Sequence, residues 1–443
     1  MASDKVANAA PLQAEPADGT TTGFAFASVT TLFFAWGFIT SLIDPLVAAV
    51  KGIFSLSDFE AQLSASAFFI AYGVMSLPAA ALLARRKSVA TVLIALVTMI
   101  AGCMLMLAAA NVAIYALVLL GLFILASGIT ILQVAANPLA AVLGRPDRSH
   151  FRLTLSQAFN SLGTFIGPYV GALLFLKGVE IEEGAALDPA VREAALVGID
   201  AAFLWIAVLI ALLALFIFLA RRLIGTAADQ AAQNASAPTS VLAMLREAAS
   251  SRWALLGGAA IFLYVGAEVA IGTQMALFLN SKDVLGVSLE QAGKMVSLYW
   301  GGAMIGRLVG SVLLTRVPAT RLLAIFAGAA AAICLFVALI GGMAAGYAAL
   351  GIGLFNSIMF PVIFTLTLER SSASKEATSG FLCFAIVGGA FVPLLVGAVS
   401  GATSYAIAFV VPAACYAALL VFGLAAARAA VIHDGASAAP SGH

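Results

Sequence analysis

Charged residues are scarce in this sequence of 443 residues. Only 10% of the residues are Asp, Glu, Lys or Arg, whereas 63% are apolar and the mean hydropathy is +1.09. Soluble domains carry about 25% charged residues, so the composition excludes an ordinary soluble protein and indicates a chain that crosses a membrane many times. The net charge of +1 offers no electrostatic basis for binding nucleic acid.

Histidine and cysteine are also rare. The three histidines, His150, His433 and His443, all lie outside the middle of the apolar runs, and the four cysteines form no CxxC pair. A membrane enzyme would need a nucleophile with its base, or a metal cluster. The sequence therefore predicts neither an enzyme nor a bound metal or cofactor.

Long apolar runs are what the sequence has in abundance. A helix needs about 20 apolar residues to cross a bilayer. We therefore expect an all-α membrane protein with twelve transmembrane helices, over residues 25–50, 61–84, 89–109, 113–143, 150–177, 200–221, 253–280, 290–315, 320–341, 345–369, 378–400 and 403–428.

Two of the links between these runs are long. Residues 178–199 are acidic, and residues 222–252 are rich in Ala, Ser and Gln and follow the sixth run. The predicted organisation is a six-helix half over residues 25–221, a cytoplasmic linker over 222–252 and a second six-helix half over 253–428. Residues 1–24 and 429–443 are predicted to be cytoplasmic tails.

The positive charges are distributed unevenly between the two sides. Of the 22 Lys and Arg residues, sixteen fall on the side of the termini, five on the other side, and Arg307 lies inside the eighth run. Since Lys and Arg are retained in the cytoplasm, both termini are expected there, in a bacterial inner membrane. The polar start of the chain predicts that the first apolar run is a spanning helix and not a cleaved signal peptide.

The two halves also resemble each other. The fifth run contains GTFIGPYVG (163–171) and the eleventh contains GGAFVPLLVG (388–397), while the basic link LLARRKSVATVLIAL (82–96) resembles LLTRVPATRLLAIF (313–326). These matches predict a parallel duplication. Transporters built from such repeats bind their substrate near the midplane, between the halves.

Three ionisable residues stand out because they lie away from the ends of the apolar runs or without a nearby partner, where a charge costs about 2.5–3.5 kcal/mol on insertion scales: Asp44, Glu268 and Arg307. Asp44 has no basic residue within a helical turn. Because removal from water disfavours a charged carboxyl group, Asp44 is suited to gain and lose a proton beside a substrate. The following Pro45 is expected to bend the helix, whereas Arg307 is assigned to a charge network on the cytoplasmic side.

Amides and aromatic residues accompany these acids. Amide groups donate and accept hydrogen bonds at once, which suits a ligand with many hydroxyl groups. The candidate sugar ligands are Gln133, Asn137, Gln157, Asn160, Gln274 and Asn356, with Glu268, and the candidate ring platforms are Phe33, Phe34, Trp36, Tyr264, Tyr299 and Trp300. The alternative is that the amides join helices to one another and that the aromatic residues face lipid or core.

Several strings resemble one known family. FFAWGFITSLIDPL (33–46), FSLSDFEAQLSASAFFIAYG (54–73), ILQVAANPLAAVLG (131–144) and HFRLTLSQAFNSLG (150–163) resemble the fucose–hexose permease group of the major facilitator superfamily. YVGAEVAIG (264–272) is similar to its glucose/galactose branch. The resemblance extends over nearly the whole chain.

The resemblance implies alternating access and proton symport of a neutral sugar. It implies that Asp44 serves proton coupling and that Gln157 and Asn160 bind sugar. Gln133 stands where the fucose permeases carry a second acid, which disfavours fucose and favours the glucose/galactose type. Glu268 stands where the fucose permease has an amide, and it is expected to bind sugar or to be a second titrating group.

The sequence thus predicts a proton–hexose symporter, with glucose or galactose preferred and N-acetylglucosamine, mannose, fructose or fucose as alternatives. Sodium coupling is the nearest alternative, because Asp44 and the amides offer oxygen ligands to a hard cation. A sugar sensor without transport would need a larger cytoplasmic module, and a drug exporter a larger and less polar cavity. The expected partners are the sugar, the proton and the lipid bilayer, and we expect a monomer.

Overall fold

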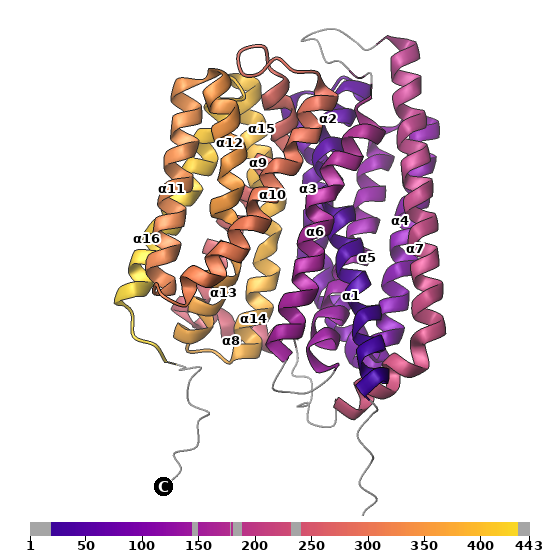
Figure 1. Cartoon of the computed structure of the whole chain (residues 1–443), viewed down its shortest axis with the longest axis vertical. Coiled ribbons are helices and arrows are strands. Elements are labelled where there is room, and N and C mark those ends of the chain that lie inside the picture. The colour runs from indigo at the N-terminus through magenta and orange to yellow at the C-terminus, as the bar shows by residue number, and fades with distance from the viewer. Residues whose placement is uncertain (1–18, 144–148, 178, 180–187, 232–240, 433–443) are drawn as a thin grey trace, which may run out of the picture.

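The computed structural model describes residues 19–143, 149–177, 179, 188–231 and 241–432, which form a bundle of long helices without strands (Figure 1). The first half contains α1 (Gly19–Ser41), α2 (Ile43–Phe54), α3 (Asp58–Arg86), α4 (Ser88–Val112), α5 (Tyr115–Val142), α6 (Ser149–Phe175) and α7 (Pro189–Ala231). The remainder contains α8 (Val241–Ser250), α9 (Arg252–Asn280), α10 (Leu289–Leu314), α11 (Ala319–Ile340), α12 (Gly342–Asn356), α13 (Met359–Arg370), α14 (Lys375–Phe384), η3 (Ala385–Val387), α15 (Gly388–Ala402), η4 (Ile407–Phe409) and α16 (Val410–Arg428).

Within the described residues, twelve helical segments are long and apolar enough to cross a membrane, as predicted. Three of them are interrupted: α1 and α2 form one span, α12 and α13 another, and α14, η3 and α15 a third.

The sixth span is longer than predicted at both ends. Its helix α7 starts at Pro189, because Asp188 caps it: the N–H of Ala190 donates to Asp188 Oδ1 at 2.8 Å. At its other end α7 continues to Ala231, inside the segment predicted as linker, which also contains α8. The division into domains stays a prediction, and most of both predicted tails lies outside the described residues.

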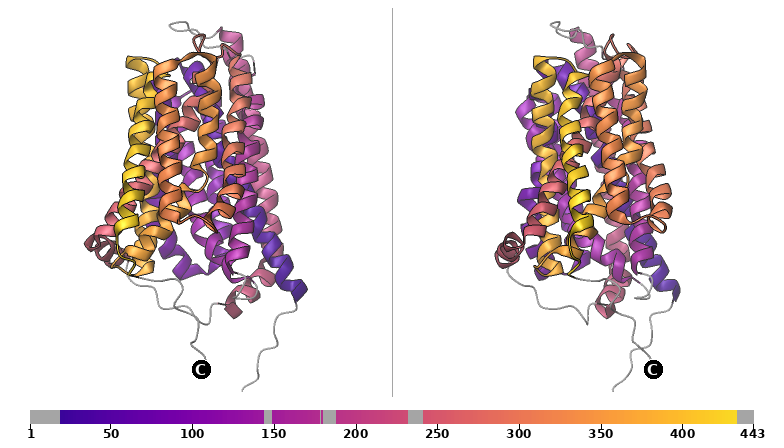
Figure 2. Two further views of the ribbon diagram at one scale, coloured as in Figure 1. Left: turned by 60° about the vertical axis from the view of Figure 1, so that its left-hand side comes forward. Right: turned by 90° about the vertical axis from the view of Figure 1, so that its left-hand side faces the viewer.

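The two halves lie side by side, with α1–α7 in one and α9–α16 in the other, and α8 at one end of the bundle (Figures 1 and 2). Helix α1 begins and α16 ends at that same end. We call it the proximal end and the opposite one the distal end. Which side of the membrane each end faces stays a prediction.

Corresponding helices pack in the same way in the two halves. α6 packs on α1, and α15 packs on α9. A Cβ added to Gly163 would lie 2.4 Å from the carbonyl oxygen of Phe34, and one added to Gly388 would lie 1.9 Å from that of Phe262. The two glycines of the predicted repeat therefore allow the same close helix contact, which supports a parallel duplication.

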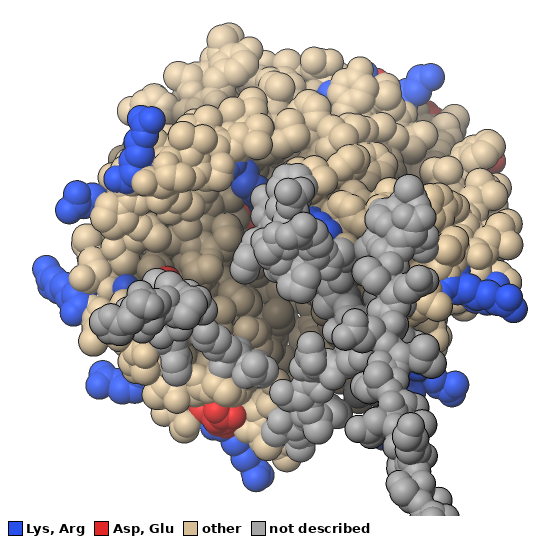
Figure 3. Space-filling model, turned by 60° about the horizontal axis from the view of Figure 1, so that its bottom comes forward, with Lys and Arg blue, Asp and Glu red and all other residues tan. Residues whose placement is uncertain are grey.

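At the distal end, polar contacts close the seam between the halves. Asp58, at the start of α3, forms an ion pair with Lys51 of the same half and accepts hydrogen bonds from Tyr405 and Ser400 of the other half, at 2.8 and 2.9 Å. Deeper in the seam, the hydroxyl of Thr273 donates to Gln62 Oε1 at 2.9 Å. The proximal face, in contrast, is hollowed between the halves (Figure 3).

We expect Asp58→Asn to loosen this distal seam. Hydrogen bonds to a charged group contribute about 1.5–3 kcal/mol, so the population open at the distal end should rise about tenfold. The measurement is the rate at which an impermeant maleimide alkylates Ser66→Cys, a position where the native hydroxyl donates to the carbonyl oxygen of Ala390 across the seam.

The matched control is Glu290→Gln. This substitution breaks the Glu290–Lys294 ion pair, which lies within α10 and does not join the halves. Equal alkylation rates in the Asp58→Asn and control variants would show that the ion pair and its hydrogen bonds do not hold the seam.

Candidate functional site

Asp44 occupies a break in the first span. The helix is interrupted at Leu42, and Pro45 has no N–H to donate to the carbonyl of Ser41. The predicted bend is therefore present. The Asp44 side chain is buried and faces the other half: Trp300 Nε1 donates to its Oδ2 at 2.6 Å.

No described Lys or Arg forms an ion pair with Asp44. Gly272 of α9 covers the other carboxylate oxygen, since a Cβ added there would lie 3.1 Å from Asp44 Oδ1. Asp44 thus bridges the two halves without a compensating cation, and it faces neither lipid nor a permanent charge.

Glu268 lies on the same face of α9 as Gly272, one helical turn away. Tyr264, one turn before it, donates to Glu268 Oε1 at 2.7 Å. Tyr299 of α10 donates to the backbone carbonyl of Glu268 at 3.1 Å and accepts from Asn356 Nδ2 at 2.7 Å. The structure therefore brings together Glu268, Tyr264 and Asn356 of the predicted site. Of two adjacent residues on α10, Tyr299 binds the backbone carbonyl of Glu268 and Trp300 binds the Asp44 carboxyl group.

The break between α12 and α13 explains part of this network. Pro361 cannot donate to the carbonyl of Ser357, and that carbonyl accepts from Arg307 Nε at 3.3 Å. The carbonyl of Asn356 lies 3.0 Å from the hydroxyl of Tyr264. Side chains thus replace backbone hydrogen bonds at the interruption, as a span in hydrocarbon requires.

Arg307 also connects the halves. Its Nη1 donates to the hydroxyl of Ser161 on α6 at 2.6 Å. The guanidinium is therefore engaged by protein groups on two sides, and it is placed to hold helices together.

The predicted amides of the first half lie on α5 and α6. Gln133 donates to the hydroxyl of Tyr72 at 3.0 Å, and Asn160 Nδ2 donates to the backbone carbonyl of Phe33 at 3.1 Å. Asn137 Oδ1 is buried and has no hydrogen-bond partner in the described part of the chain. Gln157 is partly exposed. These side chains keep donors and acceptors available to a ligand rich in hydroxyl groups.

Comparison with known proteins places this chain in a family. Residues 25–381 match the sequence profile of the Major Facilitator Superfamily. The chain belongs to this superfamily. The glucose/galactose transporter of Brucella abortus biovar 1 (strain 9-941) is 40% identical over 417 residues, which cover 94% of this chain and 97% of that protein. The L-fucose-proton symporter of Escherichia coli (strain K12) is 32% identical over 408 residues, which cover 90% and 92%.

Two solved structures agree with this chain in fold. The crystal structure of a variant of the E. coli fucose:proton symporter matches with a TM-score of 0.64 and 27% identity, covering 92% of this chain and 99% of that one. A bacterial homologue of the human lysosomal transporter Spinster, inward-facing and occupied, matches in fold with a TM-score of 0.65 at 16% identity, covering 93% and 98%. Relatives of this chain are transporters and not enzymes, which confirms that expectation from the sequence.

Two further predicted ligands, Gln274 and Trp36, form no hydrogen bond with Asp44 or Glu268 in the described part of the chain. Gln274 is six residues after Glu268, on another face of α9, and lines a small apolar crevice beside Val396 and Phe409. Trp36 is buried against Phe33, with ring centroids 4.3 Å apart. Their role in binding sugar stays a prediction.

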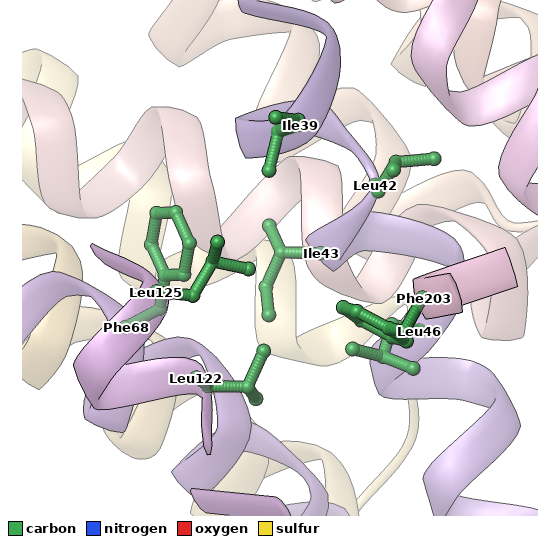
Figure 4. Close-up of a pocket in the computed structure, with 8 residues that line it drawn as sticks. All are labelled: Ile39, Leu42, Ile43, Leu46, Phe68, Leu122, Leu125 and Phe203. Carbon is green, nitrogen blue, oxygen red and sulfur yellow. The ribbon is translucent and has the colours of Figure 1, made fainter. Parts of the chain in front are cut away.

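A second apolar crevice lies inside the first half, beside the break in the first span (Figure 4). It is lined only by aliphatic and aromatic side chains: Ile39, Leu42, Ile43, Leu46, Phe68, Leu122, Leu125 and Phe203. Its lining offers no hydrogen-bonding side chain to a sugar, so the polar groups between the halves remain the candidate site.

From the sequence, Tyr299 and Trp300 are predicted only as ring platforms, and Tyr72 is not predicted as part of the site. Each of them forms a hydrogen bond with a predicted site residue in the structure. Their position near the middle of apolar runs could have indicated these hydrogen bonds, because a buried hydroxyl or indole N–H needs a partner.

Proposed function

We propose that this protein is a secondary active transporter that imports a neutral hexose of the glucose or galactose type together with protons. The observation that carries the proposal is the Asp44 carboxyl group: it is buried, it forms no ion pair with a described residue, and it lies at the contact between two halves that must move relative to each other. Intramembrane acids in such positions mark proton pathways.

The uncharged character of the surrounding groups favours a neutral cargo. Apart from the Glu268 carboxyl group, the neighbouring side chains are amides, phenols and the Trp300 indole, and the nearby guanidinium of Arg307 is already bound to Ser161 and Ser357. A phosphate ester or organic anion would need several free basic groups. The names of the relatives from Brucella abortus and E. coli support a sugar, and the higher identity to the former supports a glucose/galactose-type substrate.

Protons suit Asp44 better than sodium does. One of its oxygens accepts the N–H of Trp300, and a donor group cannot coordinate a cation. A hard cation is held by several oxygen ligands, whereas the groups described next to the Asp44 carboxylate are the Trp300 N–H and Gly272. Sodium coupling is therefore the second candidate.

The same geometry supports alternating access. The distal seam is closed by Asp58 and its partners, while the proximal face is hollow. With the proximal end in the cytoplasm of a bacterial inner membrane, as the positive charges predict, this arrangement is an inward-facing state.

The test is uptake of labelled glucose into proteoliposomes under a proton gradient alone and then under a sodium gradient alone. We expect accumulation under the first condition and equilibration under the second. Accumulation with sodium and without protons would overturn the coupling, and binding without flux would indicate a sensor. Competition by unlabelled hexoses then ranks galactose, mannose, fructose, fucose and N-acetylglucosamine.

A further inference from the structure

We propose that Trp300 is a positioning residue for proton coupling: its indole N–H binds the Asp44 carboxylate only while the distal seam is closed, and it thereby promotes loss of the proton in that state. This inference rests on the proposed proton symport, and it connects with the proton a residue that was predicted only as a ring platform.

The bond joins the two halves of the protein. Asp44 belongs to α2 and Trp300 to α10, and they are separated by 256 positions in the sequence. Within the first half, Pro45 of α2 packs against Gly171 of α6. When the halves separate at the distal end, α10 must withdraw from α2, and an N–H···O distance of 2.6 Å cannot persist.

The surroundings of Asp44 leave Trp300 as its main polar partner. The titratable groups that face Asp44 from the packed helices are Glu268 of α9 and Tyr299 of α10, and the described neighbours include no Lys or Arg. Glu268 is itself an acid, and its own partners are Tyr264 on its carboxylate and Tyr299 on its backbone carbonyl. The indole N–H is thus the group that stabilises a charge on Asp44.

The chemistry of the indole explains why the hydrogen bond favours the ionised form of Asp44. Its N–H donates and never accepts, so it binds the ionised carboxylate, which only accepts. A hydrogen bond to a charged acceptor is about twice as strong as one to a neutral acceptor. Closing the distal seam therefore favours release of the proton to water while the carboxylate keeps the electron pair. Linkage requires the converse: protonation of Asp44 weakens the bond and favours opening.

Trp300→Phe tests this directly, because it removes the N–H and keeps a ring. We measure two fluxes in proteoliposomes: net downhill sugar flux, which requires proton release, and sugar exchange at equal concentrations, which does not. At neutral pH we expect net flux to fall about tenfold and the pH of half-maximal net flux to rise by about one unit, with a smaller loss of exchange than of net flux. The control is Trp205→Phe, which alters a tryptophan that is 66% exposed on α7.

An unchanged pH midpoint in Trp300→Phe, with wild-type symport intact, would overturn the inference. Absence of proton-driven uptake in the wild type would instead refute the proposed function. If Trp300→Phe does not fold, spin labels on Phe59→Cys and Thr403→Cys report the distal seam in an otherwise native chain. Asp44→Asn should then broaden that distance distribution toward longer values, and an unaltered distribution would equally overturn the inference.

Discussion

Asp44→Asn should abolish concentrative uptake and preserve exchange. The amide has nearly the same shape and still accepts a hydrogen bond from Trp300, but it neither gains nor loses a proton. Under a proton gradient the variant should bring the sugar only to equal concentrations on the two sides, whereas wild type accumulates it. Exchange across equal concentrations should stay within about threefold of wild type, because the loss concerns coupling and not ligand binding.

Asp200→Asn is the matched control for this experiment. Asp200 lies in the same half, on α7, and accepts hydrogen bonds from Asn111 at 3.1 and 3.2 Å, away from the contact between the halves. It should accumulate sugar as wild type does. Retained accumulation in Asp44→Asn would remove the central support for the account, and loss of both accumulation and exchange would assign Asp44 to sugar binding instead.

Gly353→Ala should have a large effect for a substitution that adds a single methyl group. A Cβ at position 353 would lie 1.9 Å from the backbone carbonyl oxygen of Tyr299, so α10 and α12 would have to separate. Their separation would break the hydrogen bonds from Asn356 to Tyr299 and from Tyr299 to Glu268. We expect uptake to fall by more than about tenfold, and overpacking to destabilise the protein by about 1–3 kcal/mol.

Gly351→Ala provides a control on the same helix, two residues away. A Cβ at position 351 meets no atom within 4 Å, and alanine favours a helix over glycine by about 1 kcal/mol. This variant should transport normally and unfold at the wild-type temperature or above. Equal melting temperatures and uptake rates for the two variants, measured in the same detergent and vesicles, would contradict the close contact between α10 and α12.

The spans could be predicted because each must bury its own backbone hydrogen bonds in hydrocarbon, which gives every crossing a long apolar run. The early start of α7 escaped prediction, since it depends on a local cap by Asp188 inside a polar link. The bend at Pro45 followed from its missing N–H, whereas the break before Pro361 was not anticipated.

The two acids of the candidate site could be predicted from the sequence, but the residues that bind them could not. Asp44 and Glu268 stand out because a carboxyl group inside an apolar run costs free energy. The pairing of Asp44 with Trp300 depends on how two distant helices are rotated against each other, and helical periodicity within one segment carries no such information. For Gln274, in contrast, the periodicity was informative: a spacing of six residues from Glu268 indicates a different face of α9.

The most direct measurement is sugar-driven proton movement. Proteoliposomes loaded with a pH indicator, in buffer free of sodium and without an imposed proton gradient, receive glucose outside. The account predicts acidification of the interior in wild type and none in Asp44→Asn, at matched amounts of folded protein. Glucose entry into wild-type vesicles without any change in internal pH would contradict it.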